Sequence, residues 1–269
     1  CIYGIDIDIH AVEVAKFSLL IKLIEDETAP SVSEVVPILP DLGDNIQFGN
    51  SLVSQTELNG ISGANRQMME IAPFDWSTIN NGCGFDVIIG NPPYVNTEGM
   101  HALLPSAEVE VYKKKYKTSH KQFDKYFIFI EQAINKINEN GLVCYIVPNK
   151  FFKIGAGEKL RNLIAKERML VSLDDFGDAQ LFEDKTIYSS IILLSKAKQT
   201  SFVYSSVDSA NKLWAGEEVS SIELNSSVLN KLPWRLTTDF EFLTMLQRLD
   251  EVSVPITKHA EIFNGIQTS

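Results

Sequence analysis

The chain has 269 residues and a net charge of −11, with 45% hydrophobic and 22% charged residues. This length and composition allow a full hydrophobic core, so we expect a folded protein with one large domain and smaller appendages. The acidic balance excludes a protein whose whole surface binds phosphates.

The sequence gives no sign of membrane insertion, a disulfide framework or a metal site. No apolar run reaches the length of a transmembrane helix. Cys1, Cys83 and Cys144 lack the spacing of a disulfide framework or a zinc site, and reduced thiols in the cytoplasm are the simplest interpretation. The chain begins at Cys1 without an initiator Met or a signal peptide, which predicts a segment of a longer polypeptide.

Strand-like and helix-like segments alternate along most of the chain. Apolar β-branched runs predict strands at 2–7, 46–53, 87–89, 142–147, 170–176 and 187–195. Apolar residues at helical spacing predict helices at 8–24, 124–138 and 157–167, with a polar region at 96–121. This alternation is typical of a doubly wound α/β sheet. After residue 200 come short strand-like pieces and an amphipathic helix at 239–249, so a boundary is expected near 200.

The most informative motif is Asn91-Pro92-Pro93-Tyr94, which follows the apolar run 85–90. An exocyclic amine or an amide is a poor nucleophile, because its lone pair is delocalised into the adjoining π-system. If the Asn91 side-chain oxygen and the Pro92 carbonyl oxygen each accept one amine hydrogen, the lone pair becomes available for attack on a methyl sulfonium. Tyr94 supplies a ring for stacking. The motif predicts methyl transfer to nitrogen, and a rigid turn after a strand is the alternative.

Two further features point to ligands. Asp6 follows the first strand, at the edge where open α/β sheets bind ligands, and a carboxylate there can accept hydrogen bonds from both ribose hydroxyls. Asp8 more naturally caps the following helix. Six lysines lie in segment 112–125 with only one acid, which makes this segment a candidate for phosphate contacts or, equally, a solvated loop.

Several motifs occur in a fixed order: Tyr3-Gly-Ile-Asp-Ile-Asp8, Phe48-Gly-Asn-Ser-Leu52, Phe74-Asp-Trp76, Gly84-Phe-Asp-Val-Ile-Ile-Gly-Asn-Pro-Pro-Tyr94, Tyr126-Phe-Ile-Phe-Ile-Glu131, Gly141-Leu-Val-Cys-Tyr-Ile-Val-Pro148 and Leu181-Phe-Glu-Asp184. In these motifs the chain resembles the gamma-type adenine-N6 DNA methyltransferases. The resemblance is strongest to the methylase portion of the Eco-type fused restriction-modification enzymes of type IIG. Segment 263–268 is similar to the opening of that family's target-recognition domain.

The resemblance implies a Rossmann-like class I methyltransferase sheet that uses S-adenosylmethionine. It implies a methyltransferase core at 1–200, a connecting segment with an amphipathic helix at 201–255, and the start of a target-recognition domain at 256–269. The implied activity is site-specific methylation of adenine N6 on a flipped base within a restriction-modification system. The implied partners are double-stranded DNA and the rest of the parent polypeptide.

The resemblance also assigns roles to individual residues. The catalytic residues would be Asn91, Pro92 and Tyr94. The residues that bind the cofactor would be Asp6, Ile7, Asn50, Ser51, Asn91 and Phe129. Tyr94 and Phe182 would stack on the extruded base, which needs replacement stacking. Phe129 and Phe182 are equally compatible with positions in the core.

The chain departs from the family pattern in two places. Asn50 stands where the family usually has an Asp that accepts from the adenine amine of the cofactor, and an amide lacks the charge of a carboxylate. The family's glycine-rich loop and its strand do not occur in this sequence, so we expect a gap between strands 2–7 and 87–89. Unpaired edges there predict that this piece alone binds cofactor poorly.

Other functions stay open on the sequence alone. Cytosine N4, guanine N2 in ribosomal RNA and a glutamine amide present a similar planar nitrogen, and adenine is favoured by the resemblance only. A non-catalytic module that binds DNA or a protein partner is a different class, favoured by Asn50 and the absent loop. No nuclease-like arrangement of acids and lysine occurs in the chain.

Overall fold

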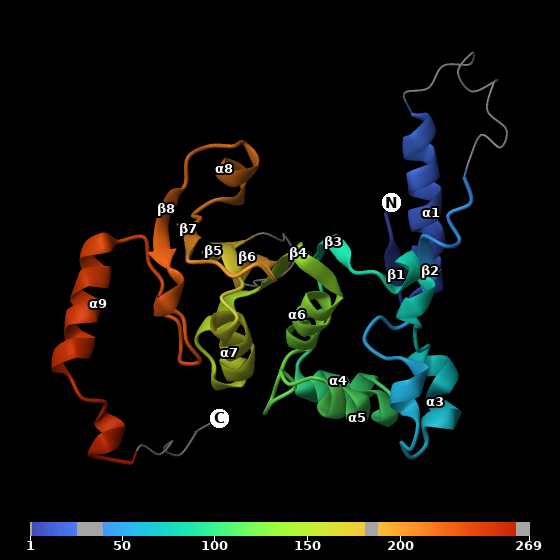
Figure 1. Cartoon of the computed structure of the whole chain (residues 1–269), viewed down its shortest axis with the longest axis horizontal. Coiled ribbons are helices and arrows are strands. Elements are labelled where there is room, and N and C mark those ends of the chain that lie inside the picture. Colours follow the sequence, from blue (N-terminus) through green and yellow to red (C-terminus); the bar gives the residue numbers. More distant parts are fainter. Residues whose placement is uncertain (1, 26–39, 181–187, 262–269) are drawn as a thin grey trace.

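The computed structural model describes residues 2–25, 40–180 and 188–261, and its strands form two sheets (Figure 1). The smaller sheet pairs β1 (Gly4–Asp6) in parallel with β2 (Ile46–Phe48). The larger sheet has the strand order β3-β4-β6-β5-β7-β8. Its strands are β3 (Phe85–Gly90), β4 (Ile137–Pro148), β5 (Leu170–Gln180), β6 (Tyr188–Ser195), β7 (Ser201–Ser206) and β8 (Ser220–Asn225).

The larger sheet is mixed. Strand β3 runs parallel to β4, and β5 runs parallel to β7. The β4/β6, β5/β6 and β7/β8 pairs are antiparallel. Parallel neighbours need crossover connections. Helices lie between β3 and β4 in the chain, whereas strand β6 lies between β5 and β7. The helical crossover from β3 to β4 is typical of an α/β fold.

Helices lie around the sheets, and α4 to α7 gather on one side of the larger sheet (Figure 1). The helices are α1 (Ile9–Ile24), α3 (Ala64–Ile71), α4 (Thr97–Leu103), α5 (Ser106–Lys115), α6 (Lys125–Lys136), α7 (Glu158–Lys166), α8 (Ala210–Trp214) and α9 (Phe240–Val252). Asp8 caps α1 by accepting from the His10 N–H, as the sequence predicts. None of the helices in the described ranges is both long and apolar enough to cross a membrane.

Strand β4 and the region 96–121 differ from the sequence expectation. Strand β4 begins at Ile137, because Ile137 already pairs with Phe85, so Gly141 lies inside the strand and does not end the preceding helix. The polar region 96–121 holds helices α4 and α5. Helix α5 forms there because it is buried on more than one side: Val109 and Val111, which lie on different sides of the helix, both pack into the core between charged neighbours in the sequence.

The larger sheet continues past residue 200, where the sequence suggested a boundary. Strands β7 and β8 extend it beyond β5. The chain after β8 also returns to the core: the buried Arg161 donates to the Lys231 carbonyl oxygen at 3.0 Å, and Trp234 stacks on Phe152 at 5.9 Å between ring centroids. The sheet itself is therefore uninterrupted at that point, and the division into domains stays a prediction.

The two sheets face each other through unpaired edges. Among the described residues β1 pairs with β2 alone, and β3 pairs with β4 alone. Aromatic rings nevertheless bring the beginnings of the two strands together, since Tyr3 and Phe85 make an edge contact at 5.9 Å. The free edges of β1 and β3 thus lie on the two sides of one interruption in strand pairing.

One face of β3 is open as well. Val87 and Ile89 point to this face and are 55% and 75% exposed. The intervening Ile88 points to the opposite face, where it packs against the core. Large exposed apolar side chains on a sheet indicate a surface that another element covers.

We expect Ile89→Lys to change the free energy of unfolding of the 269-residue chain by no more than about 0.5 kcal/mol, because the side chain is already in water. The same substitution should reduce self-association through the apolar face and free edge. Urea denaturation and sedimentation velocity measure the two effects. The matched control is Ile192→Lys in β6, whose side chain is fully buried and whose substitution should unfold the chain. Equal destabilisation by both changes would contradict an open β3 face.

Candidate functional site

The predicted site residues gather at the carboxyl ends of three strands. Asp6 ends β1, Asn50 and Ser51 follow β2, and Asn91 follows β3. The Gly49 N–H donates to the Asp6 carbonyl oxygen at 2.8 Å, so the ends of β1 and β2 are directly connected. Because Tyr3 and Phe85 meet at the beginnings of β1 and β3, we assign the ends of these strands to the same edge. Ligands of open α/β sheets bind at this edge.

The Asn91 amide is held by a tyrosine. The Tyr94 hydroxyl donates to Asn91 Oδ1 at 2.6 Å and lies 3.0 Å from the Ile146 carbonyl oxygen in β4. Burial raises the pKa of Tyr94 to about 12, so the hydroxyl keeps its proton at neutral pH and acts as a donor. The Tyr94 ring also packs edge-on against buried Tyr126 at 6.2 Å. Tyr94 therefore fixes the orientation of Asn91 relative to β4.

This arrangement leaves acceptor capacity in the motif. An amide oxygen has two lone pairs, and the Tyr94 hydroxyl occupies one of them at Asn91. Asn91 is exposed, whereas Pro92 is buried and has no N–H to donate. A fixed amide oxygen on an exposed residue, with one lone pair not used by Tyr94, suits a hydrogen-bond donor such as an amine.

The Asp6 side chain is exposed, and only one of its two carboxylate oxygens accepts a hydrogen bond from the described residues. Its Oδ1 accepts from the Asp8 N–H at 2.8 Å, and no hydrogen bond to its second oxygen occurs among the described residues. The neighbouring Ile7 is 48% exposed. A carboxylate with one oxygen fixed by the backbone and one facing solvent suits the recognition of hydroxyl groups.

The loop after β2 is held from beneath by side chains. The Ser51 carbonyl oxygen accepts from Trp76 Nε1 and Gln132 Nε2, each at 3.0 Å. The next carbonyl oxygen, of Leu52, accepts two further donors: Lys115 Nζ at 2.9 Å and Tyr116 OH at 2.7 Å. Four donors from three parts of the chain hold this loop: Trp76, Gln132 in α6, and the neighbours Lys115 and Tyr116 at the end of α5.

Asn50 itself points inward. Its side chain is 4% exposed, with Oδ1 accepting from the Leu52 N–H at 3.1 Å and Nδ2 donating to Glu108 Oε1 at 3.0 Å. The sequence predicts that this amide presents its oxygen to the cofactor. Since the Leu52 N–H uses one lone pair, a single lone pair is left for that contact, which stays a prediction.

Of the two other aromatic residues predicted for the site, the structure describes Phe129 but not Phe182. Phe129 lies on α6, is partly buried and packs against the core, as its helical spacing with other apolar residues suggests. Its contact with a cofactor stays a prediction. Phe182, predicted to stack on the target base, lies outside the described residues.

The lysine-rich segment 112–125 makes many contacts within the protein. Four of its lysines form ion pairs with carboxylates: Lys114 with Glu110, Lys115 with Glu57, Lys121 with Glu158 and Lys125 with Glu108. Lys113 Nζ lies 3.1 Å from His101 Nε2. These contacts favour a structural role for most of the segment over direct phosphate binding.

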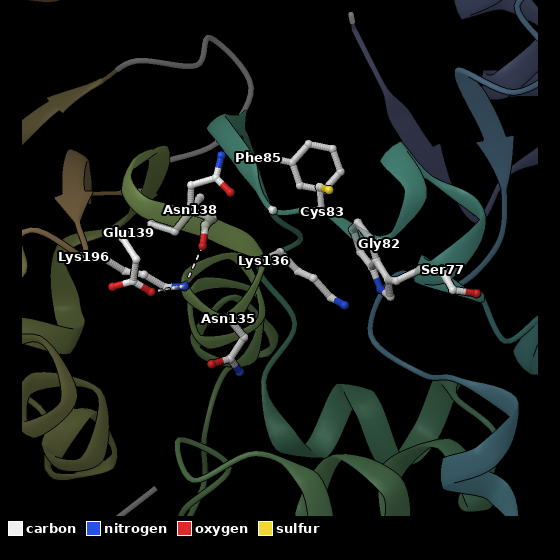
Figure 2. A pocket seen from close by; sticks show the side chains of 12 residues that line it. Ser77, Gly82, Cys83, Phe85, Asn135, Lys136, Asn138, Glu139 and Lys196 are labelled. Carbon is white, nitrogen blue, oxygen red and sulfur yellow. Dashed lines mark hydrogen bonds and ion pairs between the residues drawn. The ribbon is translucent and has the colours of Figure 1, made fainter.

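A cleft of about 510 Å³ lies elsewhere, at the beginnings of β3 and β4 (Figure 2). Its lining includes Phe85, Trp76 and Lys136, and Lys136 Nζ lies 4.8 Å from the centroid of the Trp76 ring. Burial lowers the pKa of Lys136. Lys196, on another wall, donates to the Ile137 carbonyl oxygen. Because Phe85 begins β3 and Gly90 ends it, this cleft is at the opposite end of the strand from Asn91.

Sequence reasoning missed the residues that support the edge, above all Glu108. An available signal was a glutamate within the apolar face of α5, four residues before Tyr112, because a charged residue at such a position needs a buried partner. Trp76 belongs to the motif Phe74-Asp-Trp76, but this motif does not predict the hydrogen bond from Trp76 to the Ser51 carbonyl oxygen.

Comparisons with known proteins agree with this arrangement. The family model "Eco57I restriction-modification methylase" matches residues 1–182. The chain is 39% identical over its whole length to "Type II restriction enzyme and methyltransferase RM.Eco57I" of Escherichia coli, of which it spans 26%. It is 27% identical over 199 residues to "Type II methyltransferase M.XhoI" of Xanthomonas vasicola, covering 68% of this chain and 35% of that protein.

Solved structures share the fold at low sequence identity. The cryo-EM structure of a DrdV–DNA complex aligns with 89% of this chain and 25% of that chain, with a TM-score of 0.59 and 14% identity. The restriction-modification enzyme LlaBIII bound to DNA aligns with 89% of this chain and 18% of that chain, with a TM-score of 0.51 and 15% identity. The family model covers more than half of the chain, and we conclude that the chain belongs to the Eco57I restriction-modification methylase family.

Proposed function

We propose that this chain is the methylase portion of a longer restriction-modification polypeptide that transfers a methyl group from S-adenosylmethionine to adenine N6 in double-stranded DNA. The observation that carries this proposal is exposed Asn91 at the end of β3, whose amide oxygen is fixed by the Tyr94 hydroxyl and which is followed by two prolines. Family membership supports DNA methylation within a restriction-modification system. A cytoplasmic location follows from the proposed substrate.

The residues at the sheet edge fit the cofactor. The solvent-facing oxygen of Asp6 can accept from ribose hydroxyls, with exposed Ile7 beside it. The rigid loop at Asn50 and Ser51 forms the adjoining wall, and Asn91 stands across from it at the end of β3. When bound, S-adenosylmethionine supplies an electrophilic methyl carbon whose bond to sulfur breaks, with the electron pair staying on sulfur, as the amine nitrogen bonds to that carbon.

The residues of the motif prepare the amine. The free lone pair of Asn91 Oδ1 and the Pro92 carbonyl oxygen each accept one amine hydrogen, which draws the nitrogen toward tetrahedral geometry and frees its lone pair. After transfer the nitrogen is cationic and releases one proton to solvent. The Tyr94 ring, with Phe182, replaces the stacking that the base loses on leaving the duplex.

We also propose that a strand and glycine-rich loop of the same polypeptide occupy the interruption between β1 and β3. Both neighbouring strands run parallel to their own partners, so a parallel strand would satisfy both free edges. A helix that follows this strand would cover Val87 and Ile89 on the open face of β3. In this arrangement the sheet is the complete class I methyltransferase sheet.

Two alternatives keep some support. Cytosine N4 presents the same planar amine to Asn91, so methylation of cytosine uses the same groups. A non-catalytic fragment that binds DNA or a partner is favoured by one observation, the inward orientation of Asn50, which leaves little of its side chain exposed.

Replacing Asn91 tests the central role. In a full-length enzyme that carries this chain, Asn91→Ala should lower kcat by about two to three orders of magnitude, because one acceptor for the reacting amine is lost. Cofactor binding, measured by calorimetry, should change little. Asn65→Ala, at an exposed position of α3, is the matched control and should keep full activity. Equal loss of methylation and cofactor binding in Asn91→Ala would count against the proposed role.

Two substitutions of Tyr94 distinguish its role in orienting Asn91 from its role in stacking on the target base. Tyr94→Phe keeps the ring and removes the donor to Asn91, so we expect kcat to fall by about tenfold with DNA affinity unchanged. Tyr94→Ala also removes the stacking surface and should weaken binding of the flipped base by about 1 to 3 kcal/mol, detected by 2-aminopurine fluorescence at the target position. If Tyr94→Phe behaves like wild type, the hydroxyl does not orient Asn91 during catalysis.

Cofactor binding by the isolated 269-residue chain should be poor, because the proposed glycine-rich loop is not part of it. Calorimetry with S-adenosylmethionine should detect no dissociation constant in the micromolar range. A longer polypeptide that includes the strand and loop should bind measurably under the same conditions. Micromolar binding by the isolated chain would contradict the proposed need for that strand.

A further inference from the structure

A buried carboxylate lies directly beneath the cofactor edge, and the proposed mechanism does not use it. Glu108 is on α5 and is 1% exposed. Three side chains face it from the elements around it: Asn50 donates through Nδ2 at 3.0 Å, the Tyr112 hydroxyl donates to the same Oε1, and Lys125 Nζ lies 3.6 Å away. A buried charge with this many partners is costly to remove and specific in what it accepts.

The chemistry on the two sides of Asn50 permits one orientation of its amide. A carboxylate can only accept, so the group that faces Glu108 has to be the NH₂. The backbone N–H of Leu52 can only donate, so the group that faces it has to be the oxygen. The two requirements agree, whereas a flipped amide would set oxygen against carboxylate and NH₂ against N–H. Glu108 therefore determines where Oδ1 points.

The same contact accounts for Asn in place of Asp at position 50. An Asp there would bring two carboxylates within hydrogen-bond distance in a buried site, and two such charges cannot both be ionised at neutral pH. The negative charge is instead on Glu108, with the Lys125 ammonium beside it. Lys125 also lies over the ring of Tyr112, at 5.5 Å from its centroid.

We infer that Glu108 is a positioning residue for the subsite that binds the adenine of S-adenosylmethionine, acting by fixing the Asn50 amide so that the free lone pair of Oδ1 is held for the adenine amine. The inference rests on the proposed cofactor role of the loop after β2. It assigns to α5, a helix distant in sequence from that loop, control of how the loop recognises adenine. The contact spans 58 positions of sequence.

The affinities for two cofactor analogues, with and without the adenine amine, test this role of Glu108 directly in a full-length enzyme carrying this chain. Glu108→Gln keeps the shape but removes the charge and the acceptor-only character, so the dissociation constant for S-adenosylhomocysteine should rise by about tenfold in calorimetry. The affinity for S-inosylhomocysteine, which lacks the adenine amine, should stay within about twofold of wild type. The matched control is Glu110→Gln on the same helix, where the glutamate forms a surface pair with Lys114, and both affinities should be unchanged.

An exchange of the two side chains tests the contact itself. Asn50→Asp forces two carboxylates to share a proton, which raises the pKa of the pair above that of Asp in the unfolded chain. Compared with wild type, the Asn50→Asp variant should therefore be most stable at acidic pH, and its free energy of unfolding should fall as the pH rises through the raised pKa. The double variant Asn50→Asp with Glu108→Gln restores a donor facing a carboxylate and should remove this pH dependence in thermal unfolding.

The outcomes are separable. If Glu108→Gln weakens both ligands equally, or neither, or if the exchange leaves the pH dependence in place, the inference is overturned. Failure of the proposed function looks different: the wild-type enzyme would transfer no methyl group, or Asn91→Ala would methylate normally. The two dissociation constants would still decide the role of Glu108 in that case, because they need no turnover.

Discussion

The direction of the strands is the constraint on which the site depends. Strand β1 pairs in parallel with β2, and β3 pairs in parallel with β4. The Tyr3–Phe85 contact brings the beginnings of β1 and β3 together, and on this basis we assign the residues that follow all these strands to one edge. This places the Asp6 carboxylate, the loop at Ser51 and the Asn91 amide along one edge, although they are far apart in sequence. The opposite end of β3 holds the cleft around Phe85 and Lys136, which has a cation and aromatic rings but none of these acceptors. The chemistry of the edge therefore follows from sheet topology.

The contacts around this edge differ greatly in how much they stabilise it. Buried and partly buried donors fix the loop after β2 through the Ser51 and Leu52 carbonyl oxygens, and buried Glu108 fixes the Asn50 amide. In contrast, the Lys114–Glu110 pair is exposed on both sides, and such pairs contribute about 0 to 1 kcal/mol. Rigidity at this edge comes from the buried polar network. The interruption in strand pairing between β1 and β3 is the opposite case, since neither strand has a strand partner on that side within the described residues and the Val87 and Ile89 side chains are exposed.

Local patterns in the sequence were enough to predict much of this. The Asp8 cap, the buried helix α6 and the apolar strand β3 before Asn91 each follow from residues that are close in sequence. Helix α5 was missed because charged residues interrupt its buried face, and the early start of β4 was missed because pairing with Phe85 decides it. The hydrogen bonds of Tyr94 to Ile146 and of Asn50 to Glu108 join residues more than fifty positions apart. No local pattern encodes such contacts, and they determine where the Asn91 and Asn50 amide oxygens point.

The identity of the methylated atom tests the central claim most directly. A full-length enzyme carrying this chain would be incubated with double-stranded DNA and S-adenosylmethionine labelled with ¹³C in the methyl group, and the digested nucleosides analysed by mass spectrometry. A fixed Asn91 oxygen that receives a flipped adenine predicts labelled N6-methyladenine. Label on cytosine N4 would contradict the choice of base, and label on a ring carbon or no transfer would contradict the role of Asn91 as acceptor for a reacting amine.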